Sequence, residues 1–472
     1  MAEREPVFGP GLLLALERGT GETLHEQLER RLRERIRSGA LAPGSRIPSS
    51  RALARELGIS RGVVLEAYSQ LIAEGYLFSS HGAPTRVALA AAAERPPIPA
   101  SSLQPRYQID FHPGLPDLGA FPRDSWSRSL RLAVRAAPFD ALGQDDPRGS
   151  PLLRNGLMTY LGRVRGAAPE PEHTVICSGF TQGFAVVCRA LRGRGLERVA
   201  VEEPGWARHR LIAQAAGLEP VPIAVDGEGL DVDALRGCGC EVVVVTPAHQ
   251  FPTGAVLSSD RRAALLEWAE EADGLIVEDD YDSELRYDRV AVGALQGLAP
   301  ERVCNIGSLS KRLAPALRLG WILSPSWLSG ALTYEKGVAD GGSPAIEQHA
   351  LSDFIERGEL DRHLRRMRAR YRARRETLAE ALARCLPGAR VAGVAAGLFV
   401  LVTLEGGDRG LSEERVLSEA AARGVGLEGL GWHRAGPSAG EPAGLVFGFA
   451  NLSDAAIARG ISLLAEAVRS GS

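Results

Sequence analysis

The chain has 472 residues, a net charge of −3 and ordinary proportions of hydrophobic and charged residues. Its length exceeds what one hydrophobic core usually spans, so we expect two or three domains. No apolar run approaches the ~18 residues of a membrane span, the N-terminus lacks a signal-like apolar core, and the small net charge argues against a general polyanion binder. These features predict a cytoplasmic protein that makes no membrane contact.

The charge is unevenly distributed, and the N-terminal part is basic. Between residues 21 and 87, ten arginines face seven acidic residues, a local net charge of +3. The six cysteines lack the spacing of metal ligands, so we predict buried free thiols and no metal site. They are Cys177, Cys188, Cys238, Cys240, Cys304 and Cys385.

Three helices and a hairpin are predicted in the basic part. The first helix begins at a capping box, Thr23 to Glu26, and runs to about Gly39. A short helix within residues 48–58 ends at a glycine, and a tight turn leads to a third helix capped by Ser60. A hairpin wing follows in "YLFSSHGAPTRVAL". The third helix is expected to present Val64, Tyr68, Leu71 and Ile72 on its apolar face.

The remainder of the chain has a different pattern of apolar residues. Residues 88–108 are rich in Pro, Ala and Ser and are predicted to form an interdomain linker. Beyond residue 109, short apolar runs such as 242–247 and 274–279 alternate with helical stretches, which indicates a mostly parallel, helix-covered sheet. A long Arg-rich helix, 354–386, is expected to lead into a smaller C-terminal lobe whose last helix spans 454–469.

Residues 41–87, "LAPGSRIPSSRALARELGISRGVVLEAYSQLIAEGYLFSSHGAPTRV", resemble the winged helix-turn-helix of the GntR family. Helix N-termini offer amide donors to phosphate, and Arg61 could grip guanine with two hydrogen bonds. Gly62, Val63 and Leu65 stand where many relatives carry hydroxyl or cationic side chains, so modest affinity per monomer is expected. The alternative is a protein-docking winged helix with solvated arginines, and His81 is equally well explained as a solvent-facing turn residue. The DNA-contacting positions that the resemblance implies are Arg51, Ser60, Arg61, Gly62, His81 and Gly82.

Lysine is almost absent from the chain, which has two lysines against 53 arginines. A Schiff base needs an amine that can lose its proton, which arginine cannot supply. Lys311, in "NIGSLSKRLAPALRLGW", is therefore a candidate for covalent attachment of a cofactor. Lys336, in "TYEKGV", has no such neighbourhood and is predicted to be a surface residue.

Several segments after residue 109 resemble the fold-type I, class I aminotransferases, among them "IDFHPGLPD", "SGFTQG", "EDDYDSELRY" and "GFANLS". A GntR head joined to such a domain resembles the MocR/GabR-type transcriptional regulators. The resemblance implies pyridoxal 5′-phosphate (PLP) bound as a Schiff base at Lys311. It further implies that Asp279, rather than its neighbour Asp280, pairs with the pyridinium nitrogen, that Tyr281 bonds the phenolic oxygen and that Trp206 stacks on the ring. The phosphate would be held by Gly179, Phe180, Thr181, Ser308, Ser310 and Arg318.

Two departures from the aminotransferase pattern bear on activity. Phe251, in "QFPTG", replaces the asparagine that gives the phenolic oxygen a second donor, and Val446 replaces the arginine that clamps a substrate carboxylate. Losing a bidentate anchor argues for sensing rather than fast turnover. Arg434, in "GWHRAG", is a possible substitute clamp, although a loop arginine near glycines is more often simply exposed.

These observations predict an α/β protein with a winged helix-turn-helix in residues 1–87, a linker in 88–108 and a PLP-dependent aminotransferase-like domain with a smaller C-terminal lobe in 109–472. The predicted function is a PLP-dependent transcriptional regulator that senses PLP or an amino compound through Lys311. The resemblance implies a homodimer and therefore a double-stranded DNA operator with two half-sites. Two alternatives remain, an active aminotransferase with an appended winged helix and a cofactor-free scaffold.

Overall fold

The computed structural model describes residues 16–19, 21–79, 84–88, 107–143, 146–287, 292–404, 412–436 and 443–471. The chain divides into two compact units, Met1–Pro105 and Arg106–Ser472. Among the described residues, no helix is both long and apolar enough to cross a membrane.

The first unit contains the three predicted helices and the predicted hairpin. Thr23 and Glu26 form the expected capping box, Gly58 ends the second helix in a left-handed conformation, and Ser60 caps the third. These local signals fix the helix boundaries. The elements are α1 (Leu24–Arg37), α2 (Ser50–Leu57), α3 (Arg61–Ala73), β1 (Leu77–Phe78) and β2 (Arg86–Val87).

A small hydrophobic core joins these elements. Leu28, Leu53, Val64 and Leu71 are almost fully buried in it, whereas Ile72 leaves 38% of its surface exposed, so its predicted place on the buried face is wrong. Tyr68 ties α3 to the chain before α2 through a hydrogen bond from its hydroxyl to the Pro48 carbonyl, 2.9 Å long. β1 pairs antiparallel with β2 to form the base of the wing. The predicted wing-tip residues, His81 and Gly82, lie outside the described residues.

An eight-stranded, mostly parallel sheet forms the centre of the second unit, as predicted. Its order is β4-β11-β10-β9-β8-β5-β6-β7, and only the pairs involving β11 and β7 are antiparallel. The strands are β4 (Thr174–Cys177), β5 (Arg198–Glu203), β6 (Glu219–Asp226), β7 (Gly229–Leu230), β8 (Val242–Val245), β9 (Leu275–Asp280), β10 (Val303–Ser308) and β11 (Gly320–Leu323).

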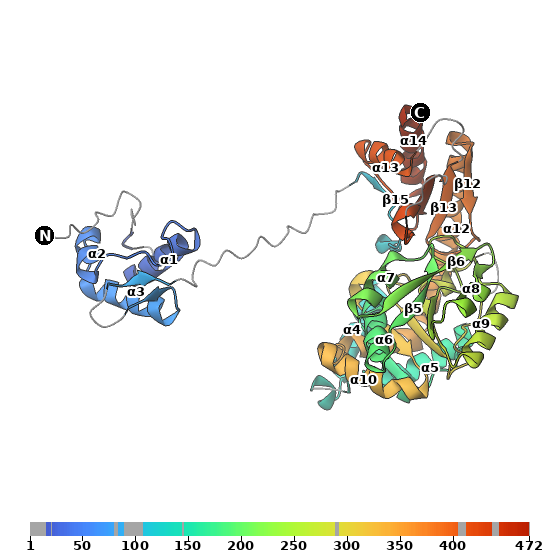
Figure 1. The fold of residues 1–472 in the computed structure, drawn as a ribbon, viewed down its shortest axis with the longest axis horizontal. Coiled ribbons are helices and arrows are strands. Elements are labelled where there is room, and N and C mark those ends of the chain that lie inside the picture. The colour runs from blue at the N-terminus through green and yellow to red at the C-terminus, as the bar shows by residue number, and fades with distance from the viewer. Residues whose placement is uncertain are drawn as a thin grey trace. The chain divides into compact units, whose positions relative to one another are not determined.

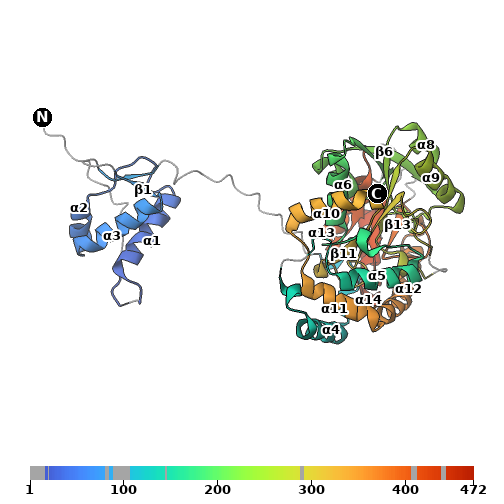
Figure 2. The ribbon, with the colours of Figure 1, turned by 90° about the horizontal axis from the view of Figure 1, so that it is seen from below.

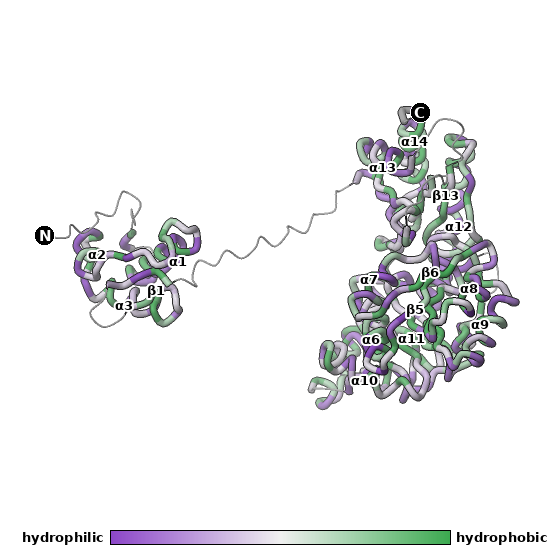
Figure 3. The backbone as a smooth tube through the Cα atoms, in the orientation of Figure 1, coloured by the Kyte–Doolittle hydropathy of each residue, from purple (hydrophilic) through white to green (hydrophobic). Residues whose placement is uncertain are grey.

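Helices cover this sheet on both sides (Figures 1 and 2). They alternate hydrophilic and hydrophobic segments along their length, as amphipathic helices packed on a core should (Figure 3). The helices are α4 (Arg123–Ala136), α5 (Pro151–Arg165), α6 (Phe180–Gly193), α7 (Ala207–Ala215), α8 (Val232–Gly237), α9 (Ser259–Glu271), α10 (Ser326–Asp340) and α11 (Ala345–Glu356), with 3-10 turns at Leu118–Ala120, Asp140–Leu142, Pro171–His173, Ser283–Leu285 and Pro315–Leu317.

The smaller lobe follows a long helix, α12 (Glu359–Cys385). An antiparallel sheet in the order β12-β13-β16-β15 packs against helices, and a short parallel pair, β3 with β14, lies beside them. The elements are β3 (Ile109–Asp110), β12 (Ala389–Ala392), β13 (Phe399–Leu404), α13 (Glu413–Ala422), β14 (Val425–Gly426), β15 (Glu428–Gly429), a 3-10 turn (Leu430–His433), β16 (Ala443–Gly448) and α14 (Asp454–Gly471).

The predicted single helix 354–386 is wrong at its start. Phe354 ends up in α11, and the chain breaks before α12 at Gly358, whose φ of +67° is left-handed. Glycine adopts this conformation at little cost, so one helix can end and another begin within two residues.

Candidate cofactor site and DNA-binding surface

The residues predicted to hold the cofactor gather at one edge of the central sheet. Gly179 follows β4, Trp206 follows β5, Asp279 lies near the end of β9, and Lys311 comes three residues after β10. The carboxyl ends of these strands meet at one edge, where open α/β sheets place their ligands.

Lys311 lies close to the backbone of the segment after β3. Its Nζ donates a hydrogen bond to the Gly114 carbonyl oxygen, 2.6 Å away. A Cβ at Gly114 would lie 2.7 Å from this nitrogen, and the residue has a φ of +104°, so only glycine suits the position. Burial lowers the pKa of Lys311, although the charges of Asp279, Asp282 and Glu428 act in the opposite direction. The amine therefore loses its proton more readily than an exposed lysine.

Asp279 and Asp280 point to opposite sides of β9, because side chains alternate along a strand. The carboxylate of Asp280 accepts a hydrogen bond from Arg165 at 3.1 Å and pairs with Arg312 at 3.5 Å. Burial acts to raise the pKa of Asp280, but these two guanidinium groups lower it. Asp280 is thus part of a buried ion network, which distinguishes it from Asp279.

Asp279 is only partly satisfied. Its Oδ2 lies 3.1 Å from Nε2 of His209, whereas its buried Oδ1 has no hydrogen-bond partner among the described residues. Burial raises the pKa of this carboxyl, and His209 acts to lower it. An orphaned, buried carboxylate oxygen is costly unless a ligand supplies a donor. The protonated ring nitrogen of PLP is such a donor, so Asp279 fits the group that the fold implies.

Tyr281 keeps its hydroxyl proton in this environment. The hydroxyl donates to the His249 carbonyl oxygen at 2.6 Å. Burial, and then the charges of Asp282 and Asp279, raise the pKa of Tyr281 well above its ordinary value. It can therefore act as a hydrogen-bond donor at neutral pH.

His249 and Asp282 form a buried pair beside Tyr281 that the sequence analysis missed. Nδ1 of His249 lies 2.8 Å from Oδ2 of Asp282, and the imidazole stacks on Phe399 with the ring centroids 4.7 Å apart. A side chain at Gly397 would collide with both members of the pair. Because His249 also carries the carbonyl that Tyr281 contacts, this pair positions the phenol.

The N-terminus of α6 has the features of a phosphate site. Gly179 precedes it with a φ of +85°, and no side chain caps the helix. The first-turn amides, which include those of Phe180 and Thr181, therefore have no cap and can bind an anion. A Cβ at Gly179 would lie 3.6 Å from Nη1 of Arg318 and 3.7 Å from Oγ of Ser310. Arg318 itself is left-handed, with a φ of 52°.

Not every predicted phosphate residue is equally well placed. Ser308 is buried at the end of β10, where its carbonyl accepts a hydrogen bond from Arg312, 2.6 Å long. This contact joins the Ser308 carbonyl to the guanidinium that also pairs with Asp280, while Ser310 and Arg318 are the side chains near Gly179.

Trp206 belongs to an aromatic group around His209. Its ring makes edge contacts with Phe180 and His209, with centroids 5.7 and 5.2 Å apart. His209 also bonds Asp279, so the aromatic group and the carboxylate are connected. The sequence signal for His209 was its position three residues after Trp206, in the first turn of α7.

The position of the aminotransferase carboxylate clamp is apolar. Val446 is fully buried with Phe399, Leu401 and Leu430, and Phe251 packs against this cluster. The Phe251 ring meets Phe399 and His433 edge-on, both at 4.8 Å. The two sequence departures thus lie together and replace two polar groups by one hydrophobic surface.

Arg434 is held in the loop after β15. Its carbonyl oxygen accepts a hydrogen bond from Arg210 at 2.8 Å, and its side chain is partly buried. Within the described residues there is no cluster of acidic, His or Cys side chains that could hold a metal. The six cysteines are free thiols, four of them buried, and Cys238 and Cys385 are partly exposed.

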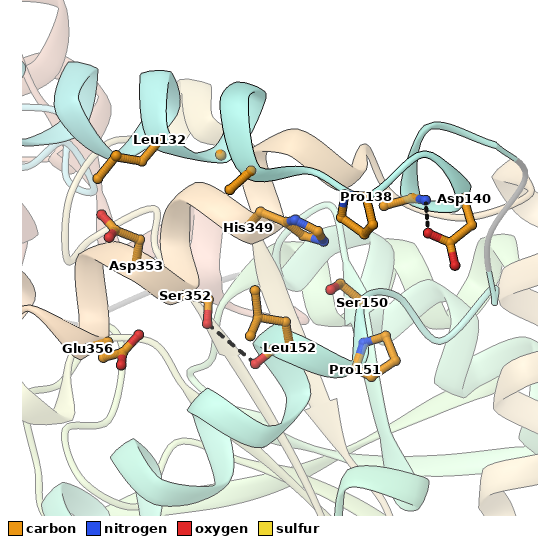
Figure 4. Close-up of a pocket in the computed structure, with 13 residues that line it drawn as sticks. Leu132, Pro138, Asp140, Ser150, Pro151, Leu152, His349, Ser352, Asp353 and Glu356 are labelled. Atoms are coloured by element: carbon orange, nitrogen blue, oxygen red, sulfur yellow. Dashed lines mark hydrogen bonds between the residues drawn. The ribbon is translucent and has the colours of Figure 1, made fainter.

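A surface pocket of about 630 Å³ lies apart from these residues (Figure 4). Leu132 and Leu152 line it together with His349 and Asp353, and Ser352 bonds the Leu152 carbonyl at its floor. None of the predicted cofactor residues lines this pocket.

In the first unit, the predicted DNA-binding residues that the structure describes share an exposed surface. Arg51 on α2 and Ser60, Arg61 and Gly62 at the start of α3 are all exposed. Nε of Arg61 donates to Oγ of Ser50 at 3.3 Å, a contact that links the two helices of the motif.

Three of the five arginines of α1 are instead engaged within the unit. Arg30 bonds Glu22, Arg33 bonds Glu74 and Arg37 bonds Tyr76. Arg46 and Arg55 are also exposed, and Arg55 lies one turn after Arg51 on α2. The basic surface is therefore formed by α2 and the start of α3.

Two family models match the chain. The model for bacterial regulatory proteins of the gntR family matches residues 24–87, and the model for aminotransferases of classes I and II matches residues 139–423.

Curated relatives share the whole arrangement. The chain is 31% identical over 464 residues to the HTH-type pyridoxine biosynthesis transcriptional regulator PdxR of Corynebacterium glutamicum, covering 98% of this chain and 99% of the relative. It is 35% identical over 389 residues to a probable rhizopine catabolism regulatory protein, MocR, of Rhizobium meliloti, covering 77% and 78% of the two chains.

The second unit also has solved structural neighbours. The kynurenine aminotransferase of Pyrococcus horikoshii superposes with a TM-score of 0.70 at 27% identity, covering 78% of this chain and 92% of the enzyme.

Proposed function

The chain belongs to the MocR-type subfamily of GntR transcriptional regulators, and we propose that it regulates transcription by detecting PLP at Lys311. The observation that carries this proposal is the unpartnered Oδ1 of Asp279, buried at the same strand edge as the rare lysine. A buried acceptor that has no donor within the protein is stabilised when a ligand supplies one.

When bound, PLP supplies an aldehyde that can condense with an amine and a ring that withdraws electrons. In this proposal Lys311 presents the amine, and its lowered pKa favours the neutral, nucleophilic form. Asp279 would accept from the ring nitrogen, and Tyr281 would turn its single hydroxyl proton from the His249 carbonyl to the phenolic oxygen. The amides at the start of α6, with Ser310 and Arg318, bind the phosphate dianion.

The apolar cluster around Val446 and Phe251 supports detection rather than turnover. Transamination requires an amino acid whose carboxylate is held while a proton moves at the α-carbon, and a buried valine cannot hold a carboxylate. Of the two effectors considered, we therefore favour PLP itself over an amino compound. The name of the Corynebacterium glutamicum relative, a regulator of pyridoxine biosynthesis, points the same way.

For the cofactor to control DNA binding, it must have a different affinity for two arrangements of the protein. We propose a homodimer in the cytoplasm that presents two heads to an operator with two half-sites. The second unit has exposed apolar side chains that a second copy could cover, notably Phe139 at 94% exposure. Leu132 and Leu152, which line the pocket of Figure 4, are also exposed, as are Val134 and Leu142.

An aminotransferase with an appended winged helix is the second candidate. The presence of Lys311, Asp279 and Tyr281 in an aminotransferase fold favours it, and the apolar clamp position opposes it.

Footprinting of the purified protein on genomic DNA, with and without PLP and candidate amines, tests the proposal. We expect protected sites of two half-sites whose occupancy changes with PLP. A parallel assay follows keto-acid production from amino acids. Occupancy that ignores PLP, combined with multiple turnovers, would establish the enzyme instead.

A further inference from the structure

The second lysine of the chain is buried, which corrects the prediction that it is a surface residue. Lys336 has 0% of its surface exposed and lies on the face of α10 that also buries Leu328 and Leu332. Figures 1 and 2 show α10 lying beside α6, the helix whose N-terminus follows Gly179. A buried ammonium is retained only where it is paired, so its partner indicates its role.

The partner is Asp340, one turn further along α10. Nζ of Lys336 donates to Oδ1 of Asp340 at 2.5 Å, and the amide of Gly342 donates to the same oxygen at 3.1 Å. Although burial acts to raise the pKa of Asp340, the hydrogen bonds from Lys336 and Gln182 lower it. The carboxylate is therefore ionised at neutral pH and holds several donors at once.

Gln182 connects the Lys336–Asp340 pair to the start of α6. Its Nε2 donates to Oδ2 of Asp340 at 2.5 Å, and its Oε1 accepts from the amide of Ser178 at 2.6 Å. Ser178 directly precedes Gly179. One chain of hydrogen bonds therefore runs from the buried lysine to the loop that leads into α6, the helix whose N-terminus has no side-chain cap.

We infer that Lys336 is a positioning residue for the cofactor phosphate, because it fixes the Ser178–Gly179 loop through Asp340 and Gln182. This inference rests on the proposed binding of PLP. The hydrogen bond that the Ser178 amide donates to Gln182 orients this peptide, and the following amides of the first turn then point in a fixed direction toward the anion. A preorganised anion site binds more tightly because less ordering is lost on binding.

The geometry also explains why this position is not an arginine. The site admits a single compact cation that bonds one carboxylate oxygen, whereas a guanidinium is a planar fork that needs more room and more acceptors. In a chain with 53 arginines, both lysines thus occupy positions that arginine cannot serve, one for its chemistry and one for its size.

The test compares PLP with pyridoxal, which has the same aldehyde and ring but no phosphate. Both are titrated into the full-length protein, and attachment at Lys311 is followed by visible absorbance. We expect Lys336→Met and Gln182→Ala to raise the Kd for PLP about tenfold, the effect of about one lost hydrogen bond with its orientation, and to leave the Kd for pyridoxal unchanged. Gln182 is only partly buried, so its variant keeps the test decisive if Lys336→Met does not fold.

The matched control is Glu335→Ala, which removes another contact between the same two helices. Glu335 bonds Arg189 on α6 at 3.2 Å and has no bond to the Ser178–Gly179 loop among the described residues. It should leave both Kd values unchanged. The inference is overturned if folded Lys336→Met and Gln182→Ala bind PLP as tightly as the wild type, or lose affinity for pyridoxal equally. If the wild-type protein binds no PLP, the proposed function itself fails.

Discussion

The two halves of the candidate site differ in chemistry. The half that faces the expected cofactor is polar, with an amine at Lys311, an unsatisfied carboxylate at Asp279, a phenol at Tyr281 and the uncapped start of α6. The half where an aminotransferase clamps its substrate is hydrophobic and tightly packed around Val446. The first half can hold PLP, whereas the buried side chains clustered with Val446 are apolar and cannot hold an amino-acid carboxylate. A protein that keeps only the cofactor half has the means to detect the cofactor without consuming an amino acid.

The largest expected effect comes from removing the amine of the polar half. Lys311→Ala should abolish the visible absorbance of the covalently attached cofactor, because no other described side chain near Asp279 offers an amine. Absorption spectra of both proteins after incubation with PLP and gel filtration check this. An unchanged spectrum in the variant would exclude Lys311 as the attachment site.

Substitutions of the two neighbouring aspartates should have separate effects, one on PLP binding and the other on the free energy of unfolding. Asp280→Asn removes one partner of a buried ion network with Arg165 and Arg312 and should lower the free energy of unfolding by about 3–5 kcal/mol. Asp279→Asn should change the stability by less than about 1 kcal/mol, since the only hydrogen-bond partner of its carboxyl among the described residues is His209, and weaken PLP binding at least about tenfold. Urea unfolding and PLP titration measure the two effects. If Asp279→Asn lowered the stability and Asp280→Asn weakened PLP binding, Asp280 rather than Asp279 would contact the cofactor.

The basic surface of the first unit should respond independently of the cofactor. Arg61→Ala should weaken operator binding by roughly 1–3 kcal/mol per half-site and leave the cofactor spectrum intact. Arg30→Ala is the matched control, because Arg30 already bonds Glu22 on the same unit. Titrations of labelled operator at fixed salt compare the two. Equal losses in both variants would indicate a general charge effect rather than a base contact.

The smallest expected effect is a pH dependence of the free energy of unfolding, which arises from a histidine–aspartate pair on the segment whose Gly114 carbonyl contacts Lys311. Asp110 accepts from His112 and raises its pKa, while burial opposes this shift, and the pair lies on the segment that leads to Gly114. Because the folded pKa exceeds the unfolded value, the stabilisation is complete below about pH 6.5 and is lost as the pH rises through the folded pKa. Both side chains are substantially exposed, so the effect should be below about 1 kcal/mol.

His112→Ala measures this contribution. Its destabilisation relative to the wild type should shrink as the pH increases from roughly 5 to roughly 9 in urea unfolding. A destabilisation that grows with pH would have the wrong sign for this pair.

Signals that act over a few residues made much of the fold predictable. The capping box at Thr23, the terminating Gly58 and the cap at Ser60 each depend on atoms of the same turn. The break at Gly358 was missed because the helical spacing continues on both sides of it. Its local signs were the glycine itself and the acidic residues Glu359 and Asp361 in the first turn of the next helix.

Contacts between distant segments were the part that the sequence could not provide. The bond between His209 and Asp279 joins residues 70 positions apart, and the pairing of His249 with Asp282 likewise requires two strand ends to meet. The burial of Lys336 depends on which face of α10 packs inward. The orphaned oxygen of Asp279 also became visible only once its neighbours were placed.

The central claim, that the cofactor is detected rather than used, is tested most directly by the effect of PLP on operator affinity. An operator fragment found by footprinting is titrated with the wild type and with Lys311→Ala, each with and without PLP, at fixed salt. We expect PLP to change the wild-type Kd by at least about fivefold, a typical allosteric coupling, and to leave the variant unchanged. If Lys311→Ala responds to PLP as the wild type does, the lysine is not the switch and the account is contradicted.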